Sequence, residues 1–309
     1  MTDRPIRVAI VGAGVWGTQH ARVYRSMDGV VLSAIVDSDR ERANALAAEV
    51  GAAAFSDIDA LTGAVDAVSL TAPTVDHASL GVRLLDRGMD TLVEKPIAAT
   101  PAEARLLIDA AERGSRILQV GHVERFNPVV RLAIEVATRP QFFEIHRLAA
   151  FSPRSLDIDV VLDLMIHDLD IVLRLTRSPV REVRAVGIPV LSRKADIANA
   201  RVEFESGCVA NLTASRVSFE KVRKLRFFQP HDYISVDYAS QTGSMVSLRM
   251  GNVVERKLDP PAAEPLKLEL ESFIDCVRAR RKPDVTGQDG LDALELARSI
   301  VAAIEQRTV

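Results

Sequence analysis

The stretch IRVAIVGAGVWG, residues 6–17, predicts a strand, a glycine-rich turn and the start of a helix. Its apolar, β-branched run leads directly into three glycines with the spacing G-x-G-x-x-G. Gly12 permits the tight turn, Gly14 lets a pyrophosphate approach the backbone, and Gly17 lets helix and strand pack closely. Anions are stabilised at a helix N-terminus, so the turn is predicted to bind a dinucleotide. The residues assigned to this role are Gly12, Gly14, Val15, Trp16 and Gly17.

A carboxylate follows the second predicted strand, residues 30–36. Asp37 comes 20 residues after Gly17, where an acid hydrogen-bonds the adenosine ribose 2′-OH and repels the 2′-phosphate of NADP. NAD is therefore the predicted cofactor. Arg40 and Arg42 are close enough that an arginine could accommodate the phosphate, which keeps NADP open. The alternative without any ligand is a glycine turn followed by a helix-capping aspartate.

Short β-rich runs alternate with helical periodicity from residue 5 to about 122. The pattern predicts a doubly wound α/β domain, a Rossmann domain of residues 1–122, with helices on both faces of a parallel sheet. The predicted strands are 6–11, 30–36, 67–71, 91–94 and 117–120, and the predicted helices are 17–26, 40–50, 77–88 and 101–113.

The sequence changes character after residue 127. A helix, a strand near 142–149, an apolar helix around 160–175 and long alternating runs predict an α+β domain on a largely antiparallel open sheet. A proline-rich connector at 258–265 leads into two closing helices, which can pack back on the first domain. Residues 123–309 are the expected substrate-binding and oligomerisation domain. Its clearest predicted strands are 213–218, 225–228, 233–238 and 244–250.

Composition excludes several classes of protein. The chain has 309 residues, 48% of them hydrophobic, and a net charge of −3, so we expect a globular protein that binds neither nucleic acid nor an anionic membrane. The longest stretch without Asp, Glu, Lys or Arg is too short for a membrane helix. Two cysteines supply neither a disulfide framework nor a metal site, and they fit a cytoplasmic location.

Two further motifs carry chemistry. TLVEKP, residues 91–96, puts an acid, a lysine and a proline at the carboxyl end of a predicted parallel strand, the edge where such sheets bind ligands. DLMIH, residues 163–167, lies in the apolar helix. With the glycine turn, these motifs resemble the glucose-fructose oxidoreductase and inositol dehydrogenase family over essentially the whole chain. The resemblance implies an NAD-dependent sugar dehydrogenase whose Lys95, Asp163 and His167 surround the carbon that exchanges hydride with the nicotinamide.

The helix of the second motif also stands out without the resemblance. Asp163, His167, Asp170 and Arg174 follow helical spacing and form one polar line on a helix that is otherwise apolar, with Asp168 the exception. A polar line on a buried helix needs partners or a cleft, because unpaired buried charge is costly. Lys95 is the expected partner, and a structural ion-pair network is the alternative.

Oxidation of a secondary alcohol requires a base within hydrogen-bond reach of the hydroxyl. His167 is the predicted general base because its ordinary pKa suits neutral pH, with Asp163 orienting it or sharing contacts with the substrate hydroxyl. Lys95 would hold the same oxygen and stabilise negative charge, and it could itself be the base if the site lowers its pKa. The sequence does not separate these assignments.

Other residues are assigned to the cofactor and the substrate by position. Ala72, Pro73, His77, Glu94 and Lys95 are expected to border the dinucleotide, although a structural role for His77, as for His20, is equally consistent. Arg147 is a further candidate for binding phosphate, because guanidinium groups bind phosphate bidentately. The substrate-binding residues assigned from the sequence are Lys95, Arg125, Asn127, Arg154, Asp163 and His167.

The residues around the presumed cleft, GHVERFNP (121–128) and FSPRSLD (151–157), are most similar to the bacterial branch of the family that oxidises the 3-hydroxyl of UDP-N-acetylglucosamine. That similarity implies a nucleotide-sugar substrate and a downstream aminotransferase in lipid A synthesis, and the family implies a homo-oligomer. Other sugars and inositol, an NAD-using glycoside hydrolase and a non-catalytic dinucleotide sensor stay open. No metal is expected.

Overall fold

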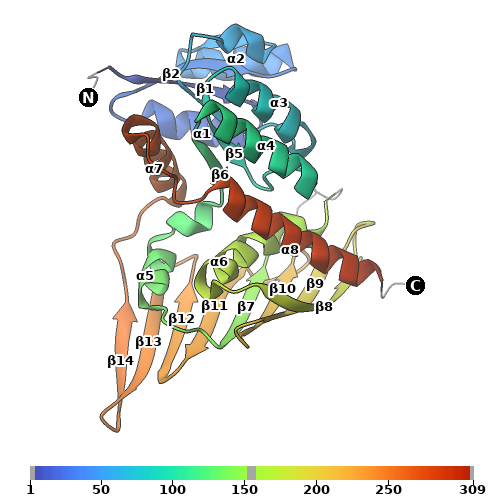
Figure 1. Ribbon diagram of the computed structural model, residues 1–309, viewed down its shortest axis with the longest axis vertical. Coiled ribbons are helices and arrows are strands. Elements are labelled where there is room, and N and C mark those ends of the chain that lie inside the picture. The colour runs from blue at the N-terminus through green and yellow to red at the C-terminus, as the bar shows by residue number, and fades with distance from the viewer. Residues whose placement is uncertain (1–3, 152–157, 307–309) are drawn as a thin grey trace. The chain divides into compact units, whose positions relative to one another are not determined.

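The computed structural model describes residues 4–151 and 158–306. The chain divides into two compact units, one of Met1–His122 with Leu266–Leu291 and the other of Val123–Pro265 with Asp292–Val309. Each unit is built around its own sheet (Figure 1). Within the described ranges, no helix has the length and apolar character needed to cross a membrane.

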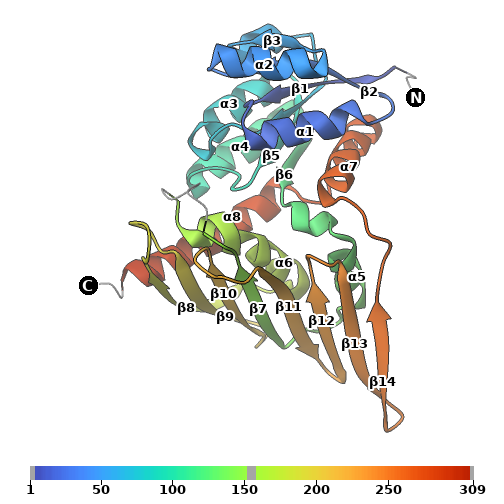
Figure 2. The same ribbon diagram turned by 180° about the vertical axis from the view of Figure 1, so that it is seen from behind.

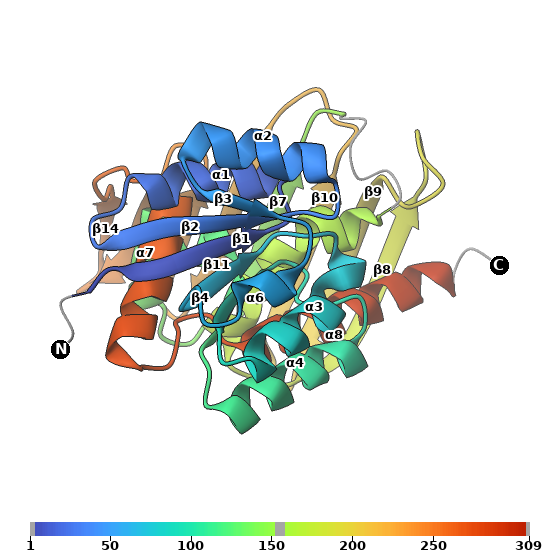
Figure 3. The ribbon, with the colours of Figure 1, turned by 90° about the horizontal axis from the view of Figure 1, so that it is seen from above.

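The first unit contains a six-stranded parallel sheet in the order β3-β2-β1-β4-β5-β6. Figure 3 shows β3, β2, β1 and β4 of this sheet from above. The strands are β1 (Ile6–Val11), β2 (Val30–Val36), β3 (Ala53–Phe55), β4 (Ala67–Leu70), β5 (Asp90–Glu94) and β6 (Leu118–Gly121). The helices are α1 (Val15–Arg25), α2 (Arg40–Val50), the 3₁₀ turn η1 (Ile58–Leu61), α3 (Thr74–Asp86), α4 (Pro101–Gly114) and α7 (Pro265–Ala279). The strand order reverses direction between β1 and β4, and the carboxyl ends of these two strands therefore border the crevice where such sheets bind ligands.

The doubly wound fold predicted from the sequence is confirmed, and β1 and β2 begin and end at the predicted residues. β3 was not predicted, because a strand of three residues is too short to show alternation. α3 begins at Thr74, earlier than expected, because Pro73 lies at the N-cap with φ −57° and directs the chain into the helix.

The second unit contains an eight-stranded sheet in the order β14-β13-β12-β11-β7-β10-β9-β8. Its strands are β7 (Phe142–Leu148), β8 (Val180–Ile188), β9 (Ile197–Phe204), β10 (Val209–Ser215), β11 (Val222–Gln229), β12 (Asp232–Asp237), β13 (Thr242–Arg249) and β14 (Asn252–Leu258). All neighbouring pairs are antiparallel except β10 and β7, so the predicted largely antiparallel sheet is confirmed.

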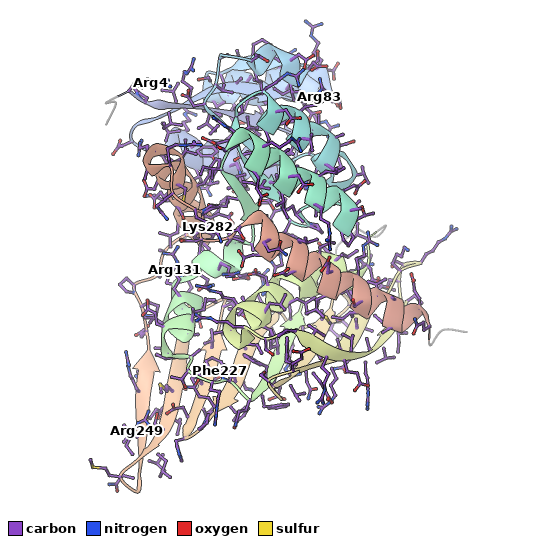
Figure 4. The ribbon with its side chains drawn as sticks, in the orientation of Figure 1. Arg4, Arg83, Arg131, Phe227, Arg249 and Lys282 are labelled. Atoms are coloured by element: carbon purple, nitrogen blue, oxygen red, sulfur yellow. The ribbon has the colours of Figure 1, made fainter. Side chains whose placement is uncertain are left out.

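Helices cover one face of this second sheet, as a comparison of Figure 1 with Figure 2 shows. They are η2 (Val123–Phe126), α5 (Pro128–Val136), the π-helical turn η3 (Val161–Met165), α6 (Ile166–Thr176) and the second part of α8 (Gly287–Glu305). Burial alternates along β7, which sends Phe143, Ile145 and Arg147 inward. The ring centroids of Phe143 and Phe227 lie 5.6 Å apart, and Phe227 is labelled in Figure 4. An apolar core between sheet and helices results.

Candidate active site

The glycine turn between β1 and α1 is shaped by close backbone contacts. Gly12 has a φ of +105°, and a Cβ there would lie 2.5 Å from the amide nitrogen of Ala72. A Cβ on Gly17 would lie 1.9 Å from the Gly12 carbonyl oxygen. A Cβ on Gly14, in contrast, would meet nothing within 4 Å. The first and third glycines are therefore required by the fold, and the second leaves the backbone open to a ligand.

The start of α1 is suited to an anion. Gly14 is the N-cap residue and provides no side-chain cap, and the first turn of the helix contains no acidic residue. The amide groups at this end are consequently available for the pyrophosphate of a dinucleotide. Val15 and Trp16 lie on this first turn with exposed side chains. These features fit NAD, whose pyrophosphate the turn would hold.

Asp37 has a second task that the sequence did not indicate. Its Oδ2 accepts the backbone N–H of Ala13 at 2.7 Å, and its Oδ1 accepts that of Asp39 at 2.8 Å. The carboxylate therefore braces the glycine turn from the end of β2, and it keeps lone pairs that can accept a ribose hydroxyl. Arg42 donates to Asp39 at 2.9 Å. This pair engages one of the two arginines considered for NADP.

A buried histidine connects two loops at the carboxyl edge of the same sheet. His77 Nε2 lies 2.8 Å from the carbonyl oxygen of Ala72, and Nδ1 lies 2.9 Å from that of Pro96. Burial lowers the pKa of His77, against the opposing effect of these carbonyl contacts. The geometry gives His77 a structural role: it joins the loop after β4 to the loop that carries Lys95. Direct contact of Ala72, Pro73 or His77 with NAD stays a prediction.

Lys95 is half-buried and follows β5 directly. Its peptide bond to Pro96 is cis. Glu94 is buried, and one of its carboxylate oxygens, Oε2, accepts the backbone N–H of Lys95 at 3.2 Å. The other, Oε1, lies 3.1 Å from Nε2 of His20. The acid of the motif thus makes two hydrogen bonds within the first unit.

The helix that carries the second motif is not a continuous α-helix, and the prediction of a regular helix over 160–175 is wrong at its start. Val161–Met165 forms a π-helical turn, in which the N–H of Ile166 bonds the carbonyl oxygen of Val161. Such an extra residue in a turn is frequent at functional sites. Asp163 on the π turn and His167 on α6 are both half-buried. They keep some access to solvent, whereas Asp168 and Asp170 are buried.

The expectation that Lys95 is the partner of the polar line is wrong for Asp170. Its carboxylate accepts two hydrogen bonds from Arg125, at 2.7 and 3.0 Å, within the second unit. Asp168, which lies off the line, accepts two from Arg147, at 2.7 and 2.9 Å. The alternative of a structural ion-pair network therefore describes this part of α6. Sequence reasoning noted Asp168 only as an exception among apolar residues.

Glu124 and Tyr238 complete the buried network around Arg147. Arg147 Nη1 donates to Glu124 at 3.0 Å, and its guanidinium lies over the Tyr238 ring at 5.2 Å. Burial alone lowers the pKa of Arg147, but the carboxylates of Asp168 and Glu124 outweigh it and raise that pKa. Neither Glu124 nor Tyr238 was identified from the sequence, because their role depends on strands brought together only by the sheet.

These contacts bear on the proposed substrate ligands. The binding of a substrate diphosphate by Arg125 and Arg147 stays a prediction. The structure does not favour it, because both guanidinium groups already form buried ion pairs with Asp170 and Asp168. Asn127 caps α5 by accepting the N–H of Val129 at 3.3 Å, and it donates to Glu124 and to the carbonyl oxygen of Tyr238. Arg154 lies outside the described residues. In 4–151 and 158–306, no group of three or more His, Cys, Asp or Glu is arranged to hold a metal ion.

Comparisons with known proteins agree with this architecture. Residues 6–122 match the family described as an oxidoreductase family with an NAD-binding Rossmann fold, and residues 138–229 match the GFO/IDH/MocA C-terminal domain. The UDP-N-acetylglucosamine 3-dehydrogenase of Acidithiobacillus ferrooxidans is 36% identical over 307 residues, which cover 97% of each chain. Inositol 2-dehydrogenase 2 of Paenarthrobacter aurescens is 26% identical over 320 residues, 97% of this chain and 96% of the relative.

Solved structures extend the similarity to three dimensions. A structure of the Acidithiobacillus ferrooxidans enzyme has a TM-score of 0.93 at 37% identity and covers 98% of both chains. Apo scyllo-inositol dehydrogenase from Lactobacillus casei has a TM-score of 0.86 at 18% identity, covers 99% of this chain and 98% of that one, and shares the fold. This chain therefore belongs to the GFO/IDH/MocA family of NAD-binding oxidoreductases.

Proposed function

We propose that this enzyme oxidises a secondary alcohol of a nucleotide sugar to a ketone, and that the alcohol is the 3-hydroxyl of UDP-N-acetylglucosamine. The similarity to the Acidithiobacillus ferrooxidans enzyme supports this substrate, because it extends over 97% of both chains. Bound NAD would supply the acceptor for the hydride that leaves the carbinol carbon.

One observation carries the dehydrogenase chemistry. His77 joins the loop after β4 to the loop after β5, through Ala72 and Pro96. Gly12 packs against Ala72 at the end of β1, so the glycine turn and the Lys95 loop lie at the same edge of one sheet. Lys95, which has a primary amine, therefore follows β5 at the edge where the dinucleotide is expected to bind, and this position supports the proposal.

The roles of the reacting side chains follow from their chemistry. Lys95 holds the substrate hydroxyl oxygen and stabilises the negative charge that develops on it. His167 takes the hydroxyl proton, and Asp163 orients the imidazole or shares the hydroxyl contact. A lysine that itself takes the proton is the alternative assignment. In both assignments the base takes the hydroxyl proton as the hydride leaves the carbinol carbon.

The wider context completes the proposal. A ketone at carbon 3 is the substrate that an aminotransferase needs, so a partner aminotransferase in cytoplasmic lipid A amino-sugar synthesis would consume it.

We also propose a homo-oligomer formed through the second sheet. Phe142, Phe228 and Tyr233 support it, because their rings stack side by side at centroid distances of 5.8 and 5.0 Å, and Phe228 is exposed.

The proposal is tested by incubating the purified protein with NAD and a panel of UDP-sugars, free sugars and inositols, while the absorbance of reduced nicotinamide is followed. A ketone trap or the aminotransferase is included because the equilibrium can favour the alcohol. We expect NADH to form when UDP-N-acetylglucosamine is the substrate. NADH with inositol alone would identify an inositol dehydrogenase, and release of a sugar without net NADH would identify a glycoside hydrolase. NAD binding without turnover of any substrate would identify a sensor.

A further inference from the structure

His20 is a buried polar side chain that the proposed reaction does not use. It lies on α1 with no exposed surface, one turn after the glycine turn. Its Nε2 lies 3.1 Å from Oε1 of Glu94, at the end of β5. An ionised carboxylate can only accept a hydrogen bond, so we assign the proton of this contact to Nε2 of His20. Its Nδ1 has no hydrogen-bond partner among residues 4–151 and 158–306.

Glu94 also forms a hydrogen bond with the next residue, Lys95. Its second oxygen, Oε2, accepts the backbone N–H of Lys95 at 3.2 Å. Gly121 on β6 packs against the same carboxylate, since a Cβ at that position would lie 2.9 Å from Oε1. The carboxylate is therefore enclosed between His20, the Lys95 backbone and β6. A buried carboxylate keeps one position only while donors of this kind satisfy it.

The surroundings of the imidazole connect it to the cofactor turn. The Trp16 ring meets it edge-on with centroids 6.4 Å apart, and Trp16 itself lies exposed on the first turn of α1. On the other side, the Tyr24 ring also lies 6.4 Å away. His20 is thus fixed between the dinucleotide turn and the core, and its contact with Glu94 is directed at the acid that accepts the Lys95 backbone N–H.

We propose that His20 is a positioning residue for Lys95: by donating to Glu94 it fixes the carboxylate that holds the Lys95 backbone, and it touches neither cofactor nor substrate. The inference rests on the proposed role of Lys95 in the reaction. His20 and Glu94 then act as one unit, and the loss of either displaces the amine from the substrate oxygen. Small displacements of a reacting group reduce turnover more than they reduce binding.

Two substitutions of His20 distinguish the effect of its hydrogen-bond donor from the effect of its side-chain volume. His20→Leu fills the space without a donor, and His20→Gln places an amide N–H near the position of Nε2. The matched control is Tyr24→Phe, which removes another buried hydrogen bond of α1, the 2.8 Å contact with Ser69, and does not touch Glu94. For each variant we would measure kcat, the sugar KM, the NAD dissociation constant, the melting temperature and the deuterium exchange of the peptide containing Lys95.

We expect His20→Leu to lower kcat by about 30-fold, with sugar KM and NAD affinity within about 3-fold of the wild type. Exchange at the Lys95 amide should accelerate, and His20→Gln should recover most of both effects. Tyr24→Phe should lower the melting temperature and leave kcat and the exchange unchanged. Unaltered kcat and exchange in His20→Leu would overturn the inference, as would equal losses in all three variants. A wild-type enzyme that oxidises no sugar would instead refute the proposed function, while the exchange result would still report on the contact itself.

Discussion

Arg147 and Asp168 form a bidentate ion pair, in which Nε and Nη2 of the arginine donate to the two carboxylate oxygens at 2.7 and 2.9 Å. Both side chains are buried, and Asp168 directly follows His167 in the chain. The pair joins β7 to α6 at the residue next to the proposed base. A base needs a fixed orientation to accept a proton efficiently, so in the proposed reaction this pair would hold the backbone beside His167 in place.

Replacing Asp168 with Asn tests how strongly the pair holds α6. The variant leaves Arg147 buried with Glu124 as its remaining acidic partner, and an under-compensated buried charge costs about 3 kcal/mol of unfolding free energy. Urea denaturation would measure the loss. Asp86→Asn is the control, because its pair with Arg113 is exposed and worth less than about 1 kcal/mol. Equal losses in the two variants would contradict the importance given to the buried pair.

Alanine at either of the first two glycines of the turn should weaken NAD binding, but only alanine at Gly12 should also lower stability. Gly12→Ala puts a Cβ on a residue with a φ of +105° and against the Ala72 backbone. We therefore expect the free energy of unfolding to fall by about 2–4 kcal/mol and NAD binding to be lost. Gly14→Ala meets nothing within 4 Å and should fold normally, but its methyl group should weaken NAD binding at least about 10-fold by blocking the pyrophosphate. Thermal unfolding and calorimetric titration with NAD would distinguish the two. Normal NAD affinity in Gly14→Ala would exclude this site for the pyrophosphate.

Asp37 should control both cofactor choice and the shape of the turn. Asp37→Ala removes the acceptor for Ala13 and the repulsion of a 2′-phosphate, so we expect NAD affinity to fall about 10-fold and the preference for NAD over NADP to shrink. Asp39→Ala removes the cap of α2 and should cost about 1 kcal/mol of unfolding free energy. It also releases Arg42, so it should raise NADP affinity while leaving NAD affinity unchanged. Dissociation constants for both nucleotides test the contrast. An unchanged preference in Asp37→Ala would show that another group discriminates.

His77 gives stability a pH dependence of defined sign. Burial lowers its pKa in the folded state, so between that value and about 6.5 the unfolded chain binds a proton that the folded chain does not. The contribution of His77 is therefore complete above about pH 6.5 and is lost as the pH falls. We expect the stability difference between wild type and His77→Gln to shrink from pH 8 to pH 5 in urea titrations. A difference that grows as the pH falls would show that His77 is charged in the folded protein.

Local sequence was sufficient for the beginning of the first unit. The run from Ile6 to Gly17 specifies strand, turn and helix through short-range rules, and the observed contacts of Gly12 and Gly17 match those rules. It was insufficient where contacts join distant segments. His77 contacts Ala72 and Pro96, and Arg147 contacts Asp168, through pairings that only the folded sheets bring together.

The π-helical turn was missed for a different reason. Asp163 and His167 have α-helical spacing in the sequence, and one extra residue in a turn leaves the apolar pattern almost unchanged. Asp168 was passed over because a single acid in an apolar helix does not reveal its partner. Chemistry-bearing residues could therefore be selected from the sequence, but which of them are engaged in buried pairs could not.

In the proposed reaction Lys95 and His167 act together on one sugar hydroxyl, and the most direct test is the initial rate of NADH formation from UDP-N-acetylglucosamine and NAD in the presence of a ketone trap. We expect the wild type to form NADH and expect Lys95→Met and His167→Asn each to lower kcat by about 1,000-fold or more, with NAD affinity within about 3-fold of the wild type. Wild-type rates in either variant, or the absence of NADH from the wild type, would contradict the account.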